Sequence, residues 1–254
     1  ELRPLLFRLD QQNRQIQKQL EDLKNAESAR KDFTANVSHE LKTPLMSISG
    51  YAELMMNGMV PPDKMQDFSG RIFHESERLS NLVADIIQLS RLDEKNGETM
   101  FEQVDIGELG EDVINNLQNR AAKKKINLEY TGESAQMQGV RHVLYEMFYN
   151  ITDNAIRYTP DGGDVKVFVG KLNGKPYFRV EDNGIGIPES EQQRIFERFY
   201  RVDKSHSRET GGTGLGLSIV KHGAVLHHAK ILLDSEPGKG TKMEILFDQT
   251  IAIP

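Results

Sequence analysis

The chain has 254 residues, of which 37% are hydrophobic and 28% charged, and its formal net charge is −6. This apolar content is sufficient for a packed core and excludes wholesale disorder, and the length predicts one large domain or two small ones. The acidic excess argues against nucleic acid as a partner, and the absence of cysteine excludes disulfides, thiolate metal sites and a cysteine nucleophile. The longest uncharged stretch, residues 210–220, is too short to cross a bilayer.

The first thirty residues carry a heptad-like pattern. Leucine or isoleucine recurs at alternating spacings of four and three, with Asn13 on the same seam. The intervening residues are mostly charged or Gln, as on the outer faces of a coiled coil. We predict that residues 1–29 form a helix in a parallel dimeric coiled coil. A single amphipathic helix on the chain's own core is the alternative.

Two long amphipathic helices are predicted next, over residues 28–59 and from about residue 63 to residue 92. Pro44 removes one backbone donor and predicts a kink, and Val60-Pro61-Pro62-Asp63 predicts a turn with Asp63 as the N-cap. Such a hairpin leaves an apolar face exposed, so two copies are expected to pair in a four-helix bundle. We place the hairpin at residues 30–95, a linker at 96–99 and a second domain at 100–254.

The pattern of the second domain is mixed α/β. Strands are predicted over residues 100–105, 127–131, 165–172, 177–181, 230–235 and 242–247, and helices over residues 106–125, 141–158 and 215–228. The segment Lys171-Leu172-Asn173-Gly174 predicts a hairpin between two of the strands. Helices segregated from a mixed sheet predict an α+β sandwich.

The helix predicted at residues 141–158 has a polar face. Glu146, Asn150 and Asn154 are four residues apart, and Arg157 and Tyr158 close the next turn. Amide oxygens suit a hard cation such as Mg²⁺, so this face is a candidate metal site. The alternative is the solvated face of an ordinary amphipathic helix.

Two glycine-containing segments are candidates for ligand contact. Residues 182–186, Asp-Asn-Gly-Ile-Gly, follow a predicted strand, where the glycines permit close backbone approach and the carboxylate can accept from an exocyclic amine. A plain tight turn is the alternative. Residues 211–217, Gly-Gly-Thr-Gly-Leu-Gly-Leu, open a predicted helix, where exposed amides suit a phosphate. Neither a Walker loop nor a dinucleotide fingerprint fits, because no Lys-Ser/Thr follows Gly216 and no strand precedes the segment.

Between these segments lies an aromatic run at residues 196–201, Phe-Glu-Arg-Phe-Tyr-Arg, and then a polar, basic stretch that begins at Lys204. This order suggests a hinged lid over phosphates, and a plain surface loop is the alternative.

In the first domain, His39 is followed directly by Glu40. His39 lies between Val37 and Leu41 of the apolar stripe, so it can point outward from the bundle. An exposed neutral imidazole can act as a nucleophile, and Glu40 can accept the displaced proton or hold the ring tautomer. A lone helical histidine with only a structural role is the alternative, and it is our interpretation of the other six histidines.

Together these motifs resemble those of bacterial two-component sensor histidine kinases, over residues 30 to about 247. Residues 33–44, Phe-Thr-Ala-Asn-Val-Ser-His-Glu-Leu-Lys-Thr-Pro, resemble the H-box of that family, and residues 150–160, Asn-Ile-Thr-Asp-Asn-Ala-Ile-Arg-Tyr-Thr-Pro, resemble its N-box. Residues 182–186, 196–199 and 212–216 resemble the G1, F and G2 boxes. All five boxes occur in the family's order.

The resemblance implies a dimerising histidine-phosphotransfer hairpin, entered by an N-terminal signalling helix, and a Bergerat-type α/β sandwich that binds ATP. His39 would be the phosphoacceptor and Glu40 its general base, and Glu40 with Thr43 would position water for dephosphorylation of a regulator. Asn150, with Asn154 nearby, would hold Mg²⁺ against the phosphates, and Asp182 would receive the adenine amino group. The other implied nucleotide contacts are Arg157, Tyr158, Gly184, Gly186, Lys204, Gly212, Thr213, Gly214, Leu215 and Gly216. Two departures stand out, since Arg157 stands where Lys is more usual and Ala229 where Gly is common.

The implied function is ATP-dependent autophosphorylation of His39 and phosphoryl transfer to an aspartate of a response regulator, with regulator phosphatase activity. The implied partners are a second copy of the chain and the regulator. The chain is expected to be the cytoplasmic part of a membrane-anchored bacterial sensor, with a transmembrane region upstream of Glu1. An ATPase of the gyrase, heat-shock or mismatch-repair group and a catalytically silent dimeric scaffold are the alternatives. Whether His39 is modified by its own or the partner's ATP site stays open.

Overall fold

The computed structural model describes residues 2–93, 100–202 and 212–248, and the chain divides after Leu82 into two compact units. The predicted linker at residues 96–99 lies outside the described residues. Within the described part of the chain, no helix combines the length and the hydropathy needed to span a bilayer.

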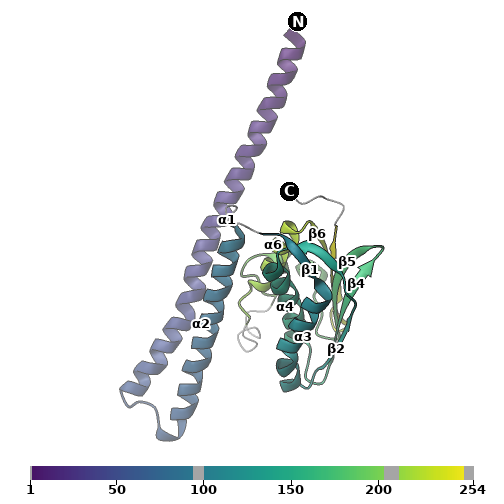
Figure 1. Ribbon diagram of the computed structural model, residues 1–254. Helices are drawn as coiled ribbons and strands as arrows, with labels where there is room; N and C mark the ends of the chain where they lie inside the picture. The colour runs from purple at the N-terminus through teal and green to yellow at the C-terminus, as the bar shows by residue number, and fades with distance from the viewer. Residues whose placement is uncertain (1, 94–99, 203–211, 249–254) are drawn as a thin grey trace. The chain divides into compact units, whose positions relative to one another are not determined.

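The first unit is a helical hairpin. Helix α1 (Leu2–Met56) and the beginning of α2 (Met65–Asp93) run side by side and are joined by a 3₁₀ turn, η1 (Pro62–Lys64) (Figure 1). The predicted coiled-coil segment and the first hairpin helix form one continuous helix, with Pro44 inside it. The prediction that Asp63 caps the second helix is wrong. Asp63 lies inside η1 because Pro62, whose fixed φ suits a first helical position, starts the turn one residue earlier.

The hairpin is closed by aromatic packing but leaves apolar side chains in water. The ring of Tyr51 on α1 meets the ring of Phe68 on α2 edge-on, with 5.5 Å between centroids. By contrast, Ile16, Leu20 and Leu23 on the heptad seam are 52%, 60% and 68% exposed. A single chain therefore does not bury the seam that the sequence pattern predicts to be an interface.

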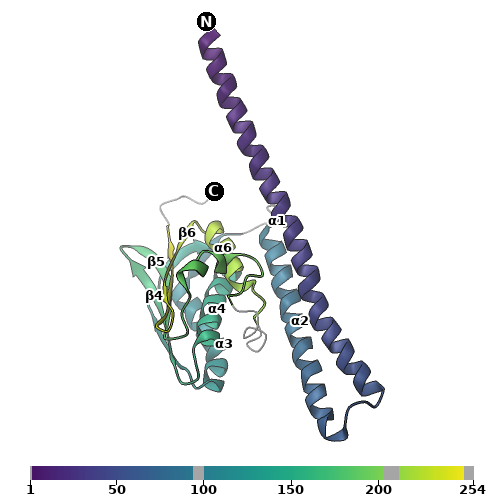
Figure 2. The same ribbon diagram turned by 180° about the vertical axis from the view of Figure 1, so that it is seen from behind.

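The second unit is an α+β sandwich. Its five-stranded mixed sheet has the order β2-β4-β5-β7-β6, and β1 and β3 form a separate antiparallel pair. The strand bounds are β1 Glu102–Asp105, β2 Asn127–Gly132, β3 Gln136–Gly139, β4 Asp164–Leu172, β5 Lys175–Asp182, β6 Ala229–Glu236 and β7 Gly240–Phe247. Three helices, α3 (Ile106–Lys123), α4 (Arg141–Tyr158) and α6 (Gly216–Leu226), cover one face of the large sheet (Figures 1 and 2). The predicted fold class is confirmed.

The predicted strands and α-helices of this unit are present in the described residues, which also hold an unpredicted strand and two short 3₁₀ helices, η2 (Glu189–Glu191) and η3 (Arg194–Phe196). The predicted β4–β5 hairpin is confirmed, and Asn173 and Gly174 have φ values of 51° and 79°, as in a type I′ turn. Strand β3 was not predicted, because Gln136-Met137-Gln138-Gly139 offers too few apolar residues for an alternating pattern. Only pairing with β1 makes this segment a strand.

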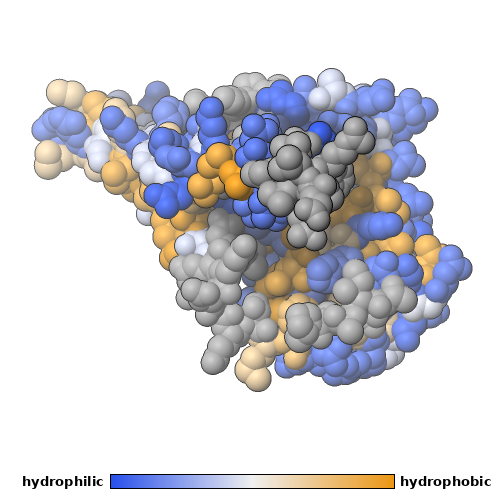
Figure 3. All heavy atoms as spheres, turned by 90° about the horizontal axis from the view of Figure 1, so that it is seen from above, coloured by the Kyte–Doolittle hydropathy of each residue, from blue (hydrophilic) through white to orange (hydrophobic). Residues whose placement is uncertain are grey.

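The core of the sandwich lies between the helices and the large sheet. The ring of Phe148 on α4 stacks on that of Phe178 on β5, with centroids 3.9 Å apart and the planes 2° from parallel. Buried His227, just after α6, accepts a hydrogen bond at Nε2 from the amide of Val140, the N-cap residue of α4. This bond ties the start of α4 to the end of α6. Hydrophilic side chains cover much of the face seen in Figure 3, and apolar ones reach it in patches.

Candidate functional site

His39 lies on the hairpin with its imidazole in water. Its side chain is 80% exposed, and its Nδ1 atom lies 3.9 Å from Oε1 of Glu40. The other carboxylate oxygen of Glu40 lies 3.7 Å from Nη2 of Arg78 on α2. Arg78 was not among the predicted residues, since only the packing of the two helices brings it to the H-box. The arrangement offers an accessible ring nitrogen beside a carboxylate that has its own countercharge.

Thr43 and Pro44 alter the backbone hydrogen bonding of α1 one turn after His39. The Thr43 hydroxyl donates to the His39 carbonyl at 3.2 Å, and Pro44 has no amide to donate to the Glu40 carbonyl. The hydroxyl of Thr43 and the carboxylate of Glu40 therefore belong to the same turn of α1, at the point where its backbone ladder is interrupted.

In the second unit, α4 brings Asn150 against the first residue of α6. The Asn150 amide Nδ2 donates to the Glu146 carbonyl at 2.8 Å, which turns Oδ1 toward Gly216. A Cβ atom on Gly216 would stand 2.5 Å from this oxygen, so the approach requires glycine at position 216. Asn154 lies half-buried one turn further along α4. The predicted N-box and G2 box thus meet in space.

Arg157 belongs to a partly buried group of charges at the end of α4. Its Nη2 atom donates to Oδ2 of Asp153 at 2.8 Å, and Oδ1 of Asp153 pairs with Nη1 of Arg120 on α3 at 2.6 Å. A Cβ atom on Gly212 would lie 3.2 Å from Nη1 of Arg157 and 3.5 Å from Nη2 of Arg201. Two guanidinium groups therefore face the backbone where the glycine-rich segment begins. Asp153, Arg120 and Arg201 were not predicted as site residues.

The side chain of Lys124 caps the C-terminal end of α4. Lys124, which follows α3, donates from Nζ to the carbonyls of Ile156, Arg157 and Thr159 at 3.0, 2.9 and 2.5 Å. Because α4 ends at Tyr158, no further helical turn supplies amides to these carbonyls. Burial lowers the pKa of Lys124 from its ordinary value. A basic residue after a helix is the only local signal for this contact, and it does not indicate which carbonyls the side chain reaches.

Asp182 lies at the end of β5, where its carboxylate organises the following turn. Oδ1 accepts from the amides of Gly184 and Thr241 at 2.9 and 3.2 Å. Burial raises the pKa of Asp182, and these two amides oppose that shift. With Oδ1 engaged, Oδ2 is the oxygen that can accept from an exocyclic amine.

Gly184 and Gly186 in this turn exclude a side chain for different steric reasons. A Cβ atom on Gly184 would lie 2.7 Å from both Oδ1 of Asp182 and the carbonyl oxygen of Tyr158. Gly186 has a φ of +69°, and a Cβ there would collide with the Glu236 carbonyl. Tyr158 contacts this turn through its backbone, because the Ile185 amide donates to the Tyr158 carbonyl, and the Tyr158 side chain is exposed.

A backbone hydrogen bond connects the glycine-rich segment to the aromatic run at residues 196–201. The Phe199 amide donates to the Gly214 carbonyl at 2.9 Å, and Gly214, with a φ of +76°, leaves room for the Phe199 backbone only as glycine. The Thr213 hydroxyl accepts from the Leu215 amide at 3.3 Å, and the Leu215 side chain is fully buried. Lys204 and Gly211, predicted for the lid, lie outside the described residues.

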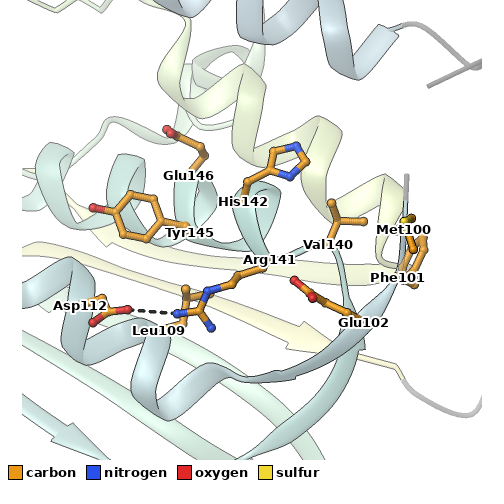
Figure 4. Close-up of a pocket in the computed structure, with 10 residues that line it drawn as sticks. All are labelled: Met100, Phe101, Glu102, Leu109, Asp112, Val140, Arg141, His142, Tyr145 and Glu146. Atoms are coloured by element: carbon orange, nitrogen blue, oxygen red, sulfur yellow. Dashed lines mark hydrogen bonds and ion pairs between the residues drawn. The ribbon is translucent and has the colours of Figure 1, made fainter. Parts of the chain in front are cut away.

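A hollow of about 650 Å³ lies beside this site, lined by residues of β1, α3 and α4. Its lining includes Glu146, one turn before Asn150, and the exposed pair of Asp112 and Arg141, whose atoms Oδ2 and Nη2 are 3.2 Å apart (Figure 4). Asn150 and Asp182 are not among the residues that line it. Among the residues that the structure describes, no group of three or more His, Cys, Asp or Glu side chains could hold a metal ion.

Comparison with known families distinguishes between the alternatives. Residues 139–251 match the model described as "Histidine kinase-, DNA gyrase B-, and HSP90-like ATPase", which kinases share with other ATPases. Residues 29–95 match the "His Kinase A (phospho-acceptor) domain", and this range contains His39, Glu40 and Thr43. The chain belongs to the sensor histidine kinases. The phospho-acceptor match is what separates this kinase chain from the gyrase- and HSP90-like ATPases.

Individual relatives agree with this membership. The chain is 38% identical over 229 residues to the "Sensor-like histidine kinase SenX3" of Mycolicibacterium smegmatis, covering 90% of this chain and 58% of that protein. It is 26% identical to full-length ShkA in complex with AMPPNP, with a TM-score of 0.61, over 86% of this chain and 46% of the other. ThkA in complex with the response regulator protein TrrA has a TM-score of 0.68 at 23% identity, over 86% of this chain and 61% of the other, which is a likeness of fold. The chain thus spans about three-fifths of the SenX3 relative it matches.

Proposed function

We propose that this chain uses ATP to phosphorylate His39 and then passes the phosphoryl group to an aspartate of a response regulator. The observation that carries the proposal is an imidazole that is 80% exposed, with a carboxylate 3.9 Å from its Nδ1 atom, inside a phospho-acceptor domain. The nucleotide-binding half of the proposal is supported by the meeting of Asn150 with Gly216 and by the carboxylate of Asp182.

The ring nitrogen that attacks follows from the position of Glu40. Since Nδ1 is the nitrogen nearest to Glu40, Nε2 is the nucleophile. A bond forms between Nε2 and the γ-phosphorus as the bond from that phosphorus to the β–γ bridging oxygen breaks, and ADP leaves with the electron pair. The Nδ1 proton passes to Glu40, whose charge is balanced by Arg78. Catalysis then consists mainly of positioning and charge neutralisation.

The nucleotide is proposed to bind along the α4 and α6 ends of the sandwich. Asp182 would accept from the adenine amino group through Oδ2, and Arg157 would contact the phosphates beside Gly212. Asn150, with Asn154 nearby, would hold Mg²⁺, since amide oxygens suit this ion and Gly216, lacking a Cβ, lets Oδ1 of Asn150 keep its position. When bound, Mg²⁺ supplies neutralisation of the phosphate charge.

Regulator phosphatase activity is a second part of the proposal. Glu40 and Thr43 are three residues apart on one helix, so their side chains can reach the same water molecule. For this role the Thr43 hydroxyl would give up its bond to the His39 carbonyl. Oriented in this way, the water would attack an aspartyl phosphate presented at His39.

The proposed partners are a second copy of the chain and a response regulator. The dimer is supported by the exposed seam at Ile16, Leu20 and Leu23, and the regulator by the phospho-acceptor match and by the fold shared with ThkA, a kinase seen in complex with a response regulator protein. We further propose that the chain works as the cytoplasmic part of a membrane-anchored bacterial sensor, because the SenX3 relative is named a sensor-like histidine kinase and extends well beyond the match. Replacing Leu20 with Asp is expected to convert dimer to monomer in sedimentation, and an unchanged dimer would contradict the seam's role.

Phosphorylation by radiolabelled ATP tests the central proposal. The chain should acquire an acid-labile, base-stable label, and His39→Ala should abolish it. His74→Ala is the matched control, because His74 is 78% exposed on the same hairpin with Glu77 3.7 Å away. Label that survives His39→Ala would refute the assignment. Steady ATP hydrolysis without a labelled chain would favour an ordinary ATPase, and undetectable Mg-ATP binding would favour a silent scaffold.

A further inference from the structure

Asp153 is a buried carboxylate shared by two arginines. Its side chain is 9% exposed, and its two oxygens pair separately with Arg120 on α3 and with Arg157 one turn further along α4. Removal of this carboxylate would leave both guanidinium groups without their common partner. Asp153 lies inside the N-box next to Asn154, and this position in the sequence does not by itself indicate a role for Asp153.

Asp153 pairs with one edge of the Arg157 guanidinium. Nη2 is bound to Asp153 at 2.8 Å, whereas Nη1 is the atom that a Cβ on Gly212 would meet at 3.2 Å. The planar fork of arginine is rigid, so fixing one nitrogen sets the direction of the other. Asp153 therefore determines that Arg157 faces the start of the glycine-rich segment.

The second arginine affects the charge of the group. Two guanidinium groups and one carboxylate carry a net charge of +1, whereas Asp153 and Arg157 alone would carry none. Arg120, with a side chain 44% exposed, thus adds one positive charge to the pair of Asp153 and Arg157, and Arg201 adds another at the Gly212 backbone. Such a group attracts a polyanion more strongly than a neutral pair would.

We propose that Asp153 is a positioning residue for the triphosphate: it pairs with Arg157 and, with Arg120 as counter-cation, directs the Arg157 guanidinium toward the backbone at Gly212, where the phosphates bind. The inference rests on the proposed function, in which Arg157 contacts the nucleotide. In this proposal the group of Asp153, Arg157 and Arg120 recognises the phosphates, whereas Asp182 recognises the adenosine moiety.

Binding of Mg-ATP and of adenosine to the purified chain, each measured by calorimetry, tests the proposal. Asp153→Asn keeps the shape of the side chain but removes its charge, and it should weaken Mg-ATP about tenfold, the usual worth of a hydrogen bond to a charged group. Adenosine affinity should stay within about twofold, because no adenosine contact is altered. Asp153→Glu should restore part of the loss. Equal losses for the two ligands would mean that Asp153 only supports the fold, and would overturn the inference.

Arg120→Gln keeps the test valid if Asp153→Asn does not fold. This exposed side chain is expected to tolerate replacement, and the variant should bind Mg-ATP about two- to fivefold more weakly because the group loses one positive charge. Arg141→Gln is the matched control, since Arg141 and Asp112 also pair α4 with α3 but lie beside the hollow in Figure 4. Unchanged Mg-ATP affinity in Arg120→Gln, or an equal loss in Arg141→Gln, would overturn the inference.

Combining substitutions separates this inference from the proposed function. In an Arg157→Gln background, Asp153→Asn should cause no further loss of Mg-ATP affinity, because its effect passes through Arg157. A full additional loss would refute the positioning role while leaving the nucleotide site intact. If Arg157→Gln alone leaves Mg-ATP affinity unchanged, the phosphate role of Arg157 itself fails, and the inference fails with it.

Discussion

Replacement of Gly216 by Ala should separate folding from nucleotide binding. Gly216 is the first residue of α6, where alanine favours the helix by up to about 1 kcal/mol. The added Cβ would stand 2.5 Å from Oδ1 of Asn150 and 3.2 Å from its Cγ. An ordinary contact between carbon and oxygen is about 3.5 Å long, so the amide must move by about 1 Å. This end of a flexible side chain can move at little cost to the fold.

The magnitude follows from what the displaced amide gives up. Its bond to the Glu146 carbonyl, 2.8 Å long, is worth about 1 kcal/mol, which roughly cancels the gain in helix propensity. The free energy of unfolding should therefore change by less than about 1 kcal/mol. In contrast, Mg-ATP affinity should fall at least tenfold, since a displaced ligand group costs about 1.5 kcal/mol or more.

Urea unfolding and calorimetric titration with Mg-ATP on the same preparation measure the two quantities. Gly223→Ala provides the comparison within α6, because its Cβ would meet the buried Met147 side chain rather than Asn150. That variant should lose stability and keep its affinity once folded. If folded Gly216→Ala binds Mg-ATP as tightly as the wild type, the position of Asn150 does not matter and the reasoning is refuted.

Three further predictions concern the scaffold of the site. Lys124→Met should cost about 2 kcal/mol of unfolding free energy, because three carbonyls at the end of α4 lose a charged donor; a loss below about 0.5 kcal/mol would contradict the capping role. Burial lowers the pKa of His227 in the folded chain below its ordinary 6.5, so its stabilising contribution is complete above that pH and is lost as the pH falls toward the folded pKa. Between about pH 7.5 and 5.5, wild-type stability should therefore fall more steeply than that of His227→Gln, and equal slopes in urea titrations would refute the assignment. Gly186→Ala should destabilise the chain by about 3 kcal/mol or more in the same assay, because a positive φ and the Glu236 carbonyl both oppose a Cβ; a near-neutral effect would show that the turn adapts.

Sequence periodicity predicted most of the elements because burial in this chain is regular. Helix α4 begins and ends at the predicted residues, since its apolar stripe is continuous and Thr159-Pro160 stops it. Local signals failed where a neighbour from a distant part of the chain supplies the structure. Strand β3 exists through β1, and the turn after Met59 begins at Pro62 rather than Asp63 because the proline fixes the backbone first.

For the site, the amino-acid order alone specifies which residue types are present and how they follow one another: a histidine followed by a carboxylate, an asparagine face, an Asp-Gly turn and a glycine-rich helix start. Packing of the elements selects which of them meet. Asn150 reaches Gly216 because α4 packs on α6, and Arg78 reaches Glu40 because α2 folds back on α1. The pairing of Arg120 with Asp153 joins residues 33 positions apart, a distance over which no helical or strand period carries information. Side-chain contacts across elements depend on packing, and packing is a property of the whole fold rather than of any local pattern.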